Sequence, residues 1–441
     1  MSIYKSKAMR INLSFTIIVL FVISTINFSC TKNNNNTNYP PSHNNDYAVF
    51  AWNDLGMHCL NPTYDKLVIL PPYNNLMTQV VQRGNPPVIV TTGITVSYKL
   101  LNNTESYTKR AYGGFWDNAL KLFGVTPAHN IGLKGNGLSG DMTLSGDHFI
   151  AEGIPTVPVD DNGTWNPYQV AEITVKDATS TVLVKTQATV PTSDEINCAK
   201  CHGSLTVNAF DDILAKHDSK HGTSLSLPAN QPVLCASCHP SPALGINTGP
   251  QKYLSQALHG AHADKPGITC YDCHPGATTK CNRSLAHTAD NGNCTTCHGD
   301  MANVASTIAS GRIPWASEPQ CVTCHTGVDG VSTGTALYRN SKGHGNMYCT
   351  ACHGSPHAMY PSRETSDNYQ PNQYQGSKIK TIGSCGVCHN SSRGEEGNIG
   401  EFSGVHGGTN PEQSIGCRAC HTSIPTNTSG WPHAYTWKNT N

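Results

Sequence analysis

The sequence has few charged residues, no excess of positive charge and no apolar run that clearly spans a membrane. Only 13% of its 441 residues are Asp, Glu, Lys or Arg, and the formal net charge is zero. No basic stripe runs along the chain, which argues against a nucleic-acid partner. The chain is instead rich in Gly, Pro, Asn, Ser and Thr. This composition favours loops and turns over long helices.

The N-terminal segment predicts export. Three basic residues precede an apolar run from 11 to 28, which is short and interrupted by Ser, Thr and Asn, as in a signal peptide. Cys30 resembles the lipidated cysteine of a lipoprotein, although Asn27 stands where that pattern prefers Leu. We therefore expect a lipoprotein-type signal peptide over 1–29, with a cleaved secretory signal or a retained helix as alternatives.

A polar, low-complexity tether at 30–45 precedes a region with the period of β-strands. The alternating runs are Ile94–Leu100, Ala171–Val175 and Val182–Thr186. One short helix is expected over 115–123, with a shared face of Trp116, Ala119, Leu120 and Phe123. Because Gly, Pro and Asn turns separate the runs, we predict an all-β, sandwich-like domain over 46–192.

The pattern Cys-x-x-Cys-His then occurs eight times. The copies are Cys198/Cys201/His202, Cys235/Cys238/His239, Cys270/Cys273/His274, Cys294/Cys297/His298, Cys321/Cys324/His325, Cys349/Cys352/His353, Cys385/Cys388/His389 and Cys417/Cys420/His421. This is the c-type haem attachment signature, in which two thiols within one turn bond to one haem and the histidine binds its iron. Zinc ribbons have no reason to place His after every second Cys. The repetition predicts eight covalent haem c groups rather than zinc or iron–sulfur sites.

The spacing of the motifs predicts the character of the region around them. Successive motifs begin 37, 35, 24, 27, 28, 36 and 32 residues apart. About thirty residues per motif are too few to enclose each porphyrin in an apolar core of its own. The haems must therefore pack together, and covalent and metal bonds would replace much of the hydrophobic burial. We expect 193–441 to be a coil-rich multihaem domain with short helices and little regular structure.

A low-spin haem needs a second axial ligand, whereas a catalytic haem needs an open position. Nine further histidines lie in the haem region, one more than eight haems require: His217, His221, His259, His262, His287, His344, His357, His406 and His433. We therefore expect bis-histidine ligation throughout. The pairs 217/221 and 259/262 have helical spacing, so each would lie on one face and could ligate two neighbouring haems. The sequence does not say which histidine serves which haem.

The segment Trp52–Cys59 is a second cluster of chemically active side chains. Met57 or His58 could bind a haem, but a structural turn with a buried histidine is the favoured interpretation. Cys59 and Cys281 remain once Cys30 and the haem cysteines are assigned, and in an exported chain they suggest a disulfide. Two further histidines, His129 and His148, are expected to be ordinary loop residues.

The chain resembles the large multihaem, octahaem c-type cytochromes of metal-respiring bacteria, including relatives that form extracellular haem filaments. The resemblance rests on the eight motifs and on the strings at 268–276 and 348–358. The strings at 52–59 and 70–74 resemble an N-terminal domain seen with such cytochromes. The resemblance covers about 48 to 437. It implies bis-histidine haems, haem attachment outside the cytoplasmic membrane, and electron transfer to or across the cell surface.

Three functions remain open at this point. The favoured one is a non-enzymatic electron carrier on the outer membrane surface or outside the cell, with the periplasm as an alternative. It would be anchored through lipidated Cys30, exchange electrons with other redox proteins or extracellular acceptors, and in one version self-assemble into filaments. The alternative is an octahaem oxidoreductase of nitrogen or sulfur compounds, which often marks one haem by Lys in place of the motif His; all eight motifs here end in His. In the third, the β-rich domain captures a ligand or partner.

Overall fold

The computed structural model describes residues 46–84, 86–276, 278–285, 287, 294–323, 336–376, 381–383 and 385–389. The expected signal peptide, Cys30 and the tether lie outside these ranges. So do seven predicted haem residues: Cys324, His325, His406, Cys417, Cys420, His421 and His433. The side chains of His344 and Cys385 also lie outside the description. None of the helices in the described ranges combines the length and hydrophobicity that crossing a membrane requires.

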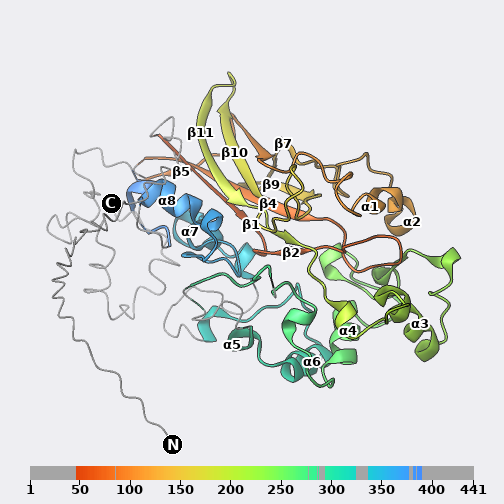
Figure 1. Ribbon diagram of the computed structural model, residues 1–441. Coiled ribbons are helices and arrows are strands. Elements are labelled where there is room, and N and C mark those ends of the chain that lie inside the picture. The colour runs from red at the N-terminus through yellow and green to blue at the C-terminus, as the bar shows by residue number, and fades with distance from the viewer. Residues whose placement is uncertain are drawn as a thin grey trace, which may run out of the picture. The chain divides into compact units, whose positions relative to one another are not determined.

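Strands fill the N-terminal part of the described chain (Figure 1). They are β1 Tyr47–Asn53, β2 His58–Cys59, β3 Leu67–Val68, β4 Asn74–Gln82, β5 Val88–Ile89, β6 Ile94–Leu100, β7 Ser139–Asp141, β8 Thr143–Ser145, β9 His148–Ile154, β10 Val170–Asp177, β11 Val182–Thr189, β12 Thr192–Ser193 and β13 Val233–Leu234. The three alternating runs found in the sequence fall in β6, β10 and β11. One sheet has the order β1-β4-β9-β8 with β5 paired to β4, and another has the order β11-β10-β6-β7.

These two sheets share one hydrophobic core. Val49 and Val80 from the first sheet belong to the same buried cluster as Val96 and Ile173 from the second. Burial alternates along β10, because successive side chains of a strand point to opposite faces. The shared cluster is the kind of core that forms between two sheets packed face to face.

Short helices dominate the later part of the described chain. The α-helices are α1 Gly114–Asp117, α2 Ala119–Phe123, α3 Ala209–His221, α4 Leu254–His262, α5 Thr295–His298, α6 Met301–Ala309, α7 Cys349–His353 and α8 Tyr369–Gln375. The 3-10 turns are Cys198–Lys200, Pro228–Asn230, Cys235–Ser237, Pro242–Leu244, Cys270–Asp272, Cys321–Thr323, Tyr338–Asn340, His344–Asn346, Thr365–Asn368 and Cys385–Val387.

The prediction of a single helix over 115–123 is wrong. The chain forms α1 and α2, which are separated by Asn118 with a non-helical φ of −108° and ψ of 5°. The Asn118 side-chain amide donates to the carbonyl of Gly114 at 2.9 Å, the kind of local bond by which Asn competes with helical backbone pairing. The predicted apolar face is wrong in part too, because Leu120 is 64% exposed whereas Leu122 is buried.

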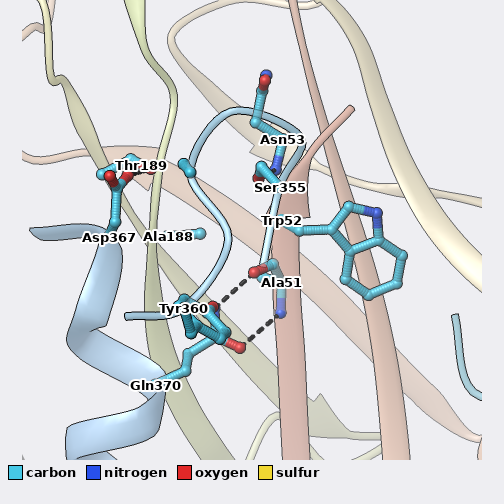
Figure 2. A pocket seen from close by; sticks show the side chains of 10 residues that line it. Ala51, Trp52, Asn53, Ala188, Thr189, Ser355, Tyr360, Asp367 and Gln370 are labelled. Atoms are coloured by element: carbon cyan, nitrogen blue, oxygen red, sulfur yellow. Dashed lines mark hydrogen bonds between the residues drawn. The ribbon is translucent and has the colours of Figure 1, made fainter. Parts of the chain in front are cut away.

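Side chains of α8 connect the edge strands of the two sheets. Gln370 accepts from the Ala51 N–H at 3.0 Å and donates to the Ala51 carbonyl at 2.5 Å (Figure 2). It also donates to the Gln187 carbonyl, in β11, at 3.2 Å. Tyr374 uses its hydroxyl in the same way, with 2.8 Å bonds to both the N–H and the carbonyl of Val49. These side chains therefore satisfy backbone groups that a further strand would otherwise pair.

Replacing Gln370 should destabilise the protein through β1. Gln370→Ala leaves a buried N–H and a buried carbonyl of Ala51 without these partners, so we expect the free energy of unfolding to fall by about 1–3 kcal/mol. Gln251→Ala, at an exposed position, should change it by less than about 0.5 kcal/mol. Urea unfolding of the haem-loaded protein, followed by far-UV circular dichroism, measures both. Equal stability of the two variants would contradict this role of Gln370.

Candidate haem-binding site

The first four attachment motifs fold in the same way. In the first, the carbonyl of Cys198 accepts from the N–H groups of Cys201 at 3.2 Å and His202 at 2.9 Å. The next three motifs repeat both bonds, at 3.2–3.3 Å and 2.8–3.0 Å. One tight turn thus carries both thiols and the following imidazole. This is the local geometry that two thioether bonds and one axial iron ligand require.

The two thiols of each of these turns differ in exposure. The first cysteine of each is partly buried, whereas the second is exposed; the exposed ones are Cys201, Cys238, Cys273 and Cys297. The Ser237 hydroxyl lies 3.9 Å from the sulfur of Cys238, a contact that was not predicted. The motif predicts that Cys238 and Cys297 each form a thioether bond to a haem. Haem attachment at Cys238 and Cys297 therefore stays a prediction from the sequence.

The seventh motif lies against the β-rich part of the chain, which the sequence did not predict. The Gly84 N–H, just after β4, donates to the carbonyl of Cys388 at 3.3 Å, and His389 forms an isolated parallel bridge with Gly84. Cys388 also packs, partly buried, against the core cluster that includes Phe50 and Trp52. These contacts differ from those of the first four motifs. The predicted roles of Cys388 as a thioether ligand and of His389 as an iron ligand stay predictions.

Four motif histidines each face a second histidine. His202 faces His262 with 6.1 Å between ring centroids, His239 faces His217 at 6.5 Å, His274 faces His259 at 6.1 Å, and His298 faces His357 at 6.2 Å. A metal bound between two imidazoles would separate their centroids by roughly 6.3 Å, given a bond of about 2 Å to each ring nitrogen. The observed separations therefore fit an iron held between the two rings of each pair.

Within the described ranges, no group of three or more His, Cys, Asp or Glu side chains gathers as a metal site. A structural zinc ion takes four protein ligands. Two facing imidazoles would suit a metal whose remaining ligands come from a bound cofactor such as haem.

In four of the facing rings, Nδ1 lies against a backbone carbonyl. In α4, Nδ1 of His259 lies 2.8 Å from the Ser255 carbonyl, and Nδ1 of His262 lies 2.7 Å from the Leu258 carbonyl. Outside α4, Nδ1 of His239 lies 2.9 Å from the Lys252 carbonyl, and Nδ1 of His357 lies 3.1 Å from the Leu55 carbonyl. Because a carbonyl only accepts, Nδ1 carries the proton and Nε2 keeps its lone pair for a metal.

Helix α3 contributes to two motifs. Asp212, in its first turn, accepts from Nδ1 of His202 at 3.2 Å, and His217, further along, faces His239. A hydrogen bond from Lys216, with others from the Gly203 N–H and His202, lowers the pKa of Asp212 to about 2. The carboxylate is therefore ionised at neutral pH. An ionised acceptor behind a ligating imidazole increases its basicity toward the metal.

Helix α4 also contributes to two motifs. His259 and His262, three positions apart, face the third and the first motif histidine respectively. These two motifs are in direct contact as well. The Lys200 ammonium lies 2.7 and 2.8 Å from the carboxylate oxygens of Asp272, and the Asn197 N–H donates to the Asp272 carbonyl at 3.1 Å. The first and third motifs are therefore spatial neighbours.

The third and fourth motifs are neighbours too. Burial, together with His259, His298 and His357, lowers the pKa of His274 to about 4. The ring is thus neutral near pH 7, which is the form that binds a metal. Burial first, and the nearby Cys294 thiol after it, raise the pKa of Cys270, so the first cysteines of the two motifs lie close together.

Other predicted ligands take different positions. His221 lies 4.9 Å from His217 between ring centroids, too close for two rings that share a metal. His287 bonds to the Ser284 hydroxyl at 3.2 Å, and His353 contacts the Thr381 hydroxyl at 3.5 Å.

The Trp52–Cys59 segment is a structural turn, which was the favoured interpretation. Nε2 of His58 lies 2.6 Å from a carboxylate oxygen of Asp54, and both residues are buried. Asp54 also accepts from the Asn75 amide at 2.8 Å. The imidazole is therefore engaged within the turn.

The expectation that His148 is a loop residue is wrong. It begins β9, and its ring lies 5.0 Å from that of Tyr348. His129 does lie in a loop, where it stacks on Tyr107 at 3.5 Å. The alternation of apolar residues along the sequence did not distinguish His148 from His129, because His148 stands at the very start of its strand.

Cys59 and Cys281 are free thiols, so the suggested disulfide is not formed. Burial first, and the nearby Cys281 thiol second, raise the pKa of Cys59. Burial likewise raises the pKa of Cys281 to about 11. Raised pKa values disfavour the thiolate, which is the form that enters disulfide formation.

Sequence reasoning missed the acceptors behind the histidines. Asp212 could be found only once α3 was known to pass behind the first motif. The carbonyls of Leu55 and Lys252 carry no side-chain signal at all. The acceptors of His259 and His262 lie four residues earlier in the chain. A predicted helix over these residues would therefore have indicated them.

Part of the chain matches a known family. Residues 302–354 match the family model described as "Cytochrome c554 and c-prime". This stretch contains the motifs that begin at Cys321 and Cys349. The match supports a c-type cytochrome with covalently bound haem that transfers electrons.

No curated protein matches the chain. Among solved structures, the chain is similar to MtrC from Shewanella baltica OS185, with 16% sequence identity and a TM-score of 0.14. The similarity covers 69% of this chain and 43% of that one, so this chain spans less than half the length of MtrC. A TM-score this low supports no conclusion about the fold.

Proposed function

We propose that this chain is a multihaem electron-transfer protein in which each of eight haem c groups is held by a Cys-x-x-Cys-His turn and by a second histidine. The observation that carries the proposal is the set of four facing histidine pairs, with ring centroids 6.1–6.5 Å apart. Bound haem supplies reversible one-electron chemistry at its iron, and the protein supplies binding and orientation. Iron with two histidine ligands has no open axial position, which favours electron transfer over catalysis.

The four pairs assign a second ligand to each of four haems. His262 would serve the haem at Cys198 and Cys201, and His217 the haem at Cys235 and Cys238. His259 would serve the haem at Cys270 and Cys273, and His357 the haem at Cys294 and Cys297. We call these haems 1, 2, 3 and 4 in chain order.

The spatial order of these haems differs from their order in the chain. Helix α3 holds the second ligand of haem 2 and the carboxylate behind the first ligand of haem 1. Helix α4 holds second ligands of haems 1 and 3, and the Lys200–Asp272 contact joins their motifs. We put haem 4 next to haem 3, because the Cys294 thiol is close enough to Cys270 to raise its pKa. The proposed route for electrons is therefore 2, 1, 3, 4, with haem 1 between haems 2 and 3.

We place this function at the cell envelope or outside the cell. The basis is the N-terminal sequence, with its signal-peptide pattern and Cys30 as a site for lipidation. Partners would be other redox proteins or extracellular electron acceptors. The chemistry of the site needs no other co-reactant, because each haem accepts and passes on one electron.

Spectroscopy of the purified, haem-loaded protein tests the proposal. We expect eight haems per chain, one for each motif, with ferric iron low-spin and unreactive toward cyanide. The imidazole planes lie 26° and 32° apart in two pairs and 74° and 86° apart in the other two. Electron paramagnetic resonance should therefore contain both the rhombic signal of near-parallel rings and the more anisotropic signal of near-perpendicular rings. A substantial high-spin fraction, or ready binding of cyanide or nitrite, would favour an oxidoreductase instead.

The ligand of haem 2 is tested by two substitutions in α3. His217→Ala should convert one haem per chain from low-spin to high-spin, because its iron loses an axial imidazole. His221→Ala, four residues further along the same helix, should leave the spectrum unchanged. Optical and paramagnetic resonance spectra at equal haem content measure the difference. If His221→Ala alone produced the high-spin haem, the assignment of His217 would fail.

The adjacency of haems 1 and 3 is tested by double substitutions. His259→Ala and His262→Ala should each create one high-spin haem, and together two, because the two histidines serve different haems. The two high-spin irons of the 259/262 double variant should broaden each other's resonance more than those of a 217/259 double variant, in which haem 1 lies between the altered haems. Equal broadening in the two double variants would count against the order 2, 1, 3.

A further inference from the structure

The ligand His357 has an unusual backbone conformation. Its φ is +61°, in the left-handed region that side chains other than glycine rarely adopt. Its ring faces His298 at 6.2 Å with only 26° between the planes. A residue in this region needs surrounding contacts that hold it there. Those contacts come from Arg283 and from the Trp52–Cys59 turn, which stands about 300 positions earlier in the chain.

Two carbonyls of the turn reach the His357 segment. The Leu55 carbonyl accepts from Nδ1 of His357 at 3.1 Å. The Gly56 carbonyl accepts from the guanidinium of Arg283 at 2.9 Å, and the Arg283 N–H in turn donates to the His357 carbonyl at 2.6 Å. Both the ring and the backbone of His357 are thus tied to this turn. A third contact runs from the Asn53 N–H to the Ser355 hydroxyl at 3.1 Å, near the small pocket of Figure 2.

The turn and the guanidinium are themselves fixed. The side-chain carbonyl of Asn53 accepts from the N–H groups of Leu55 at 3.0 Å and Gly56 at 2.6 Å. Arg283 forms a two-pronged ion pair with Asp367 at 2.8 and 3.0 Å, and both side chains are at most 2% exposed. A buried charged pair of this kind gives a defined position to whatever else it binds.

Gly56 packs against the residue that precedes His357. Its φ is +78°, and a Cβ built on it would lie 1.7 Å from the backbone oxygen of Pro356. No side chain fits there unless Pro356 moves away, and His357 would move with it. The close approach therefore makes the position of the histidine depend on the absence of a side chain at position 56.

We propose that the Trp52–Cys59 turn positions the second axial ligand of haem 4, with the Leu55 carbonyl setting the tautomer and ring orientation of His357 and the Gly56 contact setting its backbone. The proposal rests on the function proposed above. Leu55, Gly56 and Arg283 are positioning residues, since none of them touches the iron. The region before residue 192 thereby takes part in a haem site although it carries no attachment motif.

The test is Gly56→Ala in the full-length, haem-loaded protein. The number of haems per chain should be unchanged, while one haem shifts from low-spin to high-spin and becomes reactive toward cyanide. Gly146→Ala is the matched control, because Gly146 also has a positive φ, +66°, but an added Cβ meets nothing within 4 Å. A low-spin spectrum in Gly56→Ala, identical to that of Gly146→Ala, would overturn the proposal.

Combination with His357→Ala separates this inference from the proposed function. If His357→Ala alone leaves every haem low-spin, the ligand assignment is wrong. If His357→Ala creates one high-spin haem and Gly56→Ala creates none, only the positioning role is wrong. When both act as proposed, the double variant has one high-spin haem, the same as either single variant.

A milder variant decides the matter if Gly56→Ala yields no folded protein. Asn53→Ala removes the acceptor that fixes the N–H groups of Leu55 and Gly56, together with the amide that donates to Asn74 and Asn75, and adds no bulk. A looser Leu55 carbonyl weakens the bond to Nδ1 of His357, and a less basic ligand stabilises ferric iron less. The reduction potential of one haem should therefore rise in a redox titration. Potentials equal to those of the parent protein would overturn the proposal.

Discussion

The bond from a histidine Nδ1–H to a backbone carbonyl is the interaction on which the proposed haem sites depend. An imidazole can bind iron through either nitrogen, and a free ring rotates about two side-chain bonds. A carbonyl behind Nδ1 removes both freedoms, because it forces the proton onto Nδ1 and points Nε2 the other way. His239, His259, His262 and His357 all have this arrangement.

The local structure of the haem region follows from this need. In α4 the helix supplies the acceptor itself, because a histidine ring can reach the carbonyl four residues earlier. The nine residues of α4 thus orient the proposed ligands of two haems. Elsewhere the acceptor comes from a distant segment, as with Leu55 for His357, and no helix is needed. Short helices joined by coil are sufficient wherever covalent and iron bonds replace a hydrophobic core.

How far the sequence predicts this molecule depends on how local each feature is. The attachment turns and the strands β6, β10 and β11 were predictable because their signals are repeated motifs and period-2 alternation. The break at Asn118 was not, because it arises from a side-chain bond that propensity does not include. The ligand pairs were not predictable either. His262 precedes the third motif closely in the chain yet faces the ring of the first, His202.

The two predicted regions of the chain depend on each other through bonds between distant residues. Gln370, from beyond the sixth motif, pairs the backbone of Ala51 across 319 positions, and Leu55 receives the bond from His357 across 302. In the first case the haem region completes an edge strand; in the second the strand-rich region orients a proposed haem ligand. A variant that lacks residues 46–192 would therefore lose more than an accessory domain, because its haem region would not stay intact. It would remove the acceptor behind His357 and leave Gln370 and Tyr374 without their backbone partners. If haem 4 is bound as proposed, the strand-rich region is thus part of the framework that holds it, as well as a body of its own.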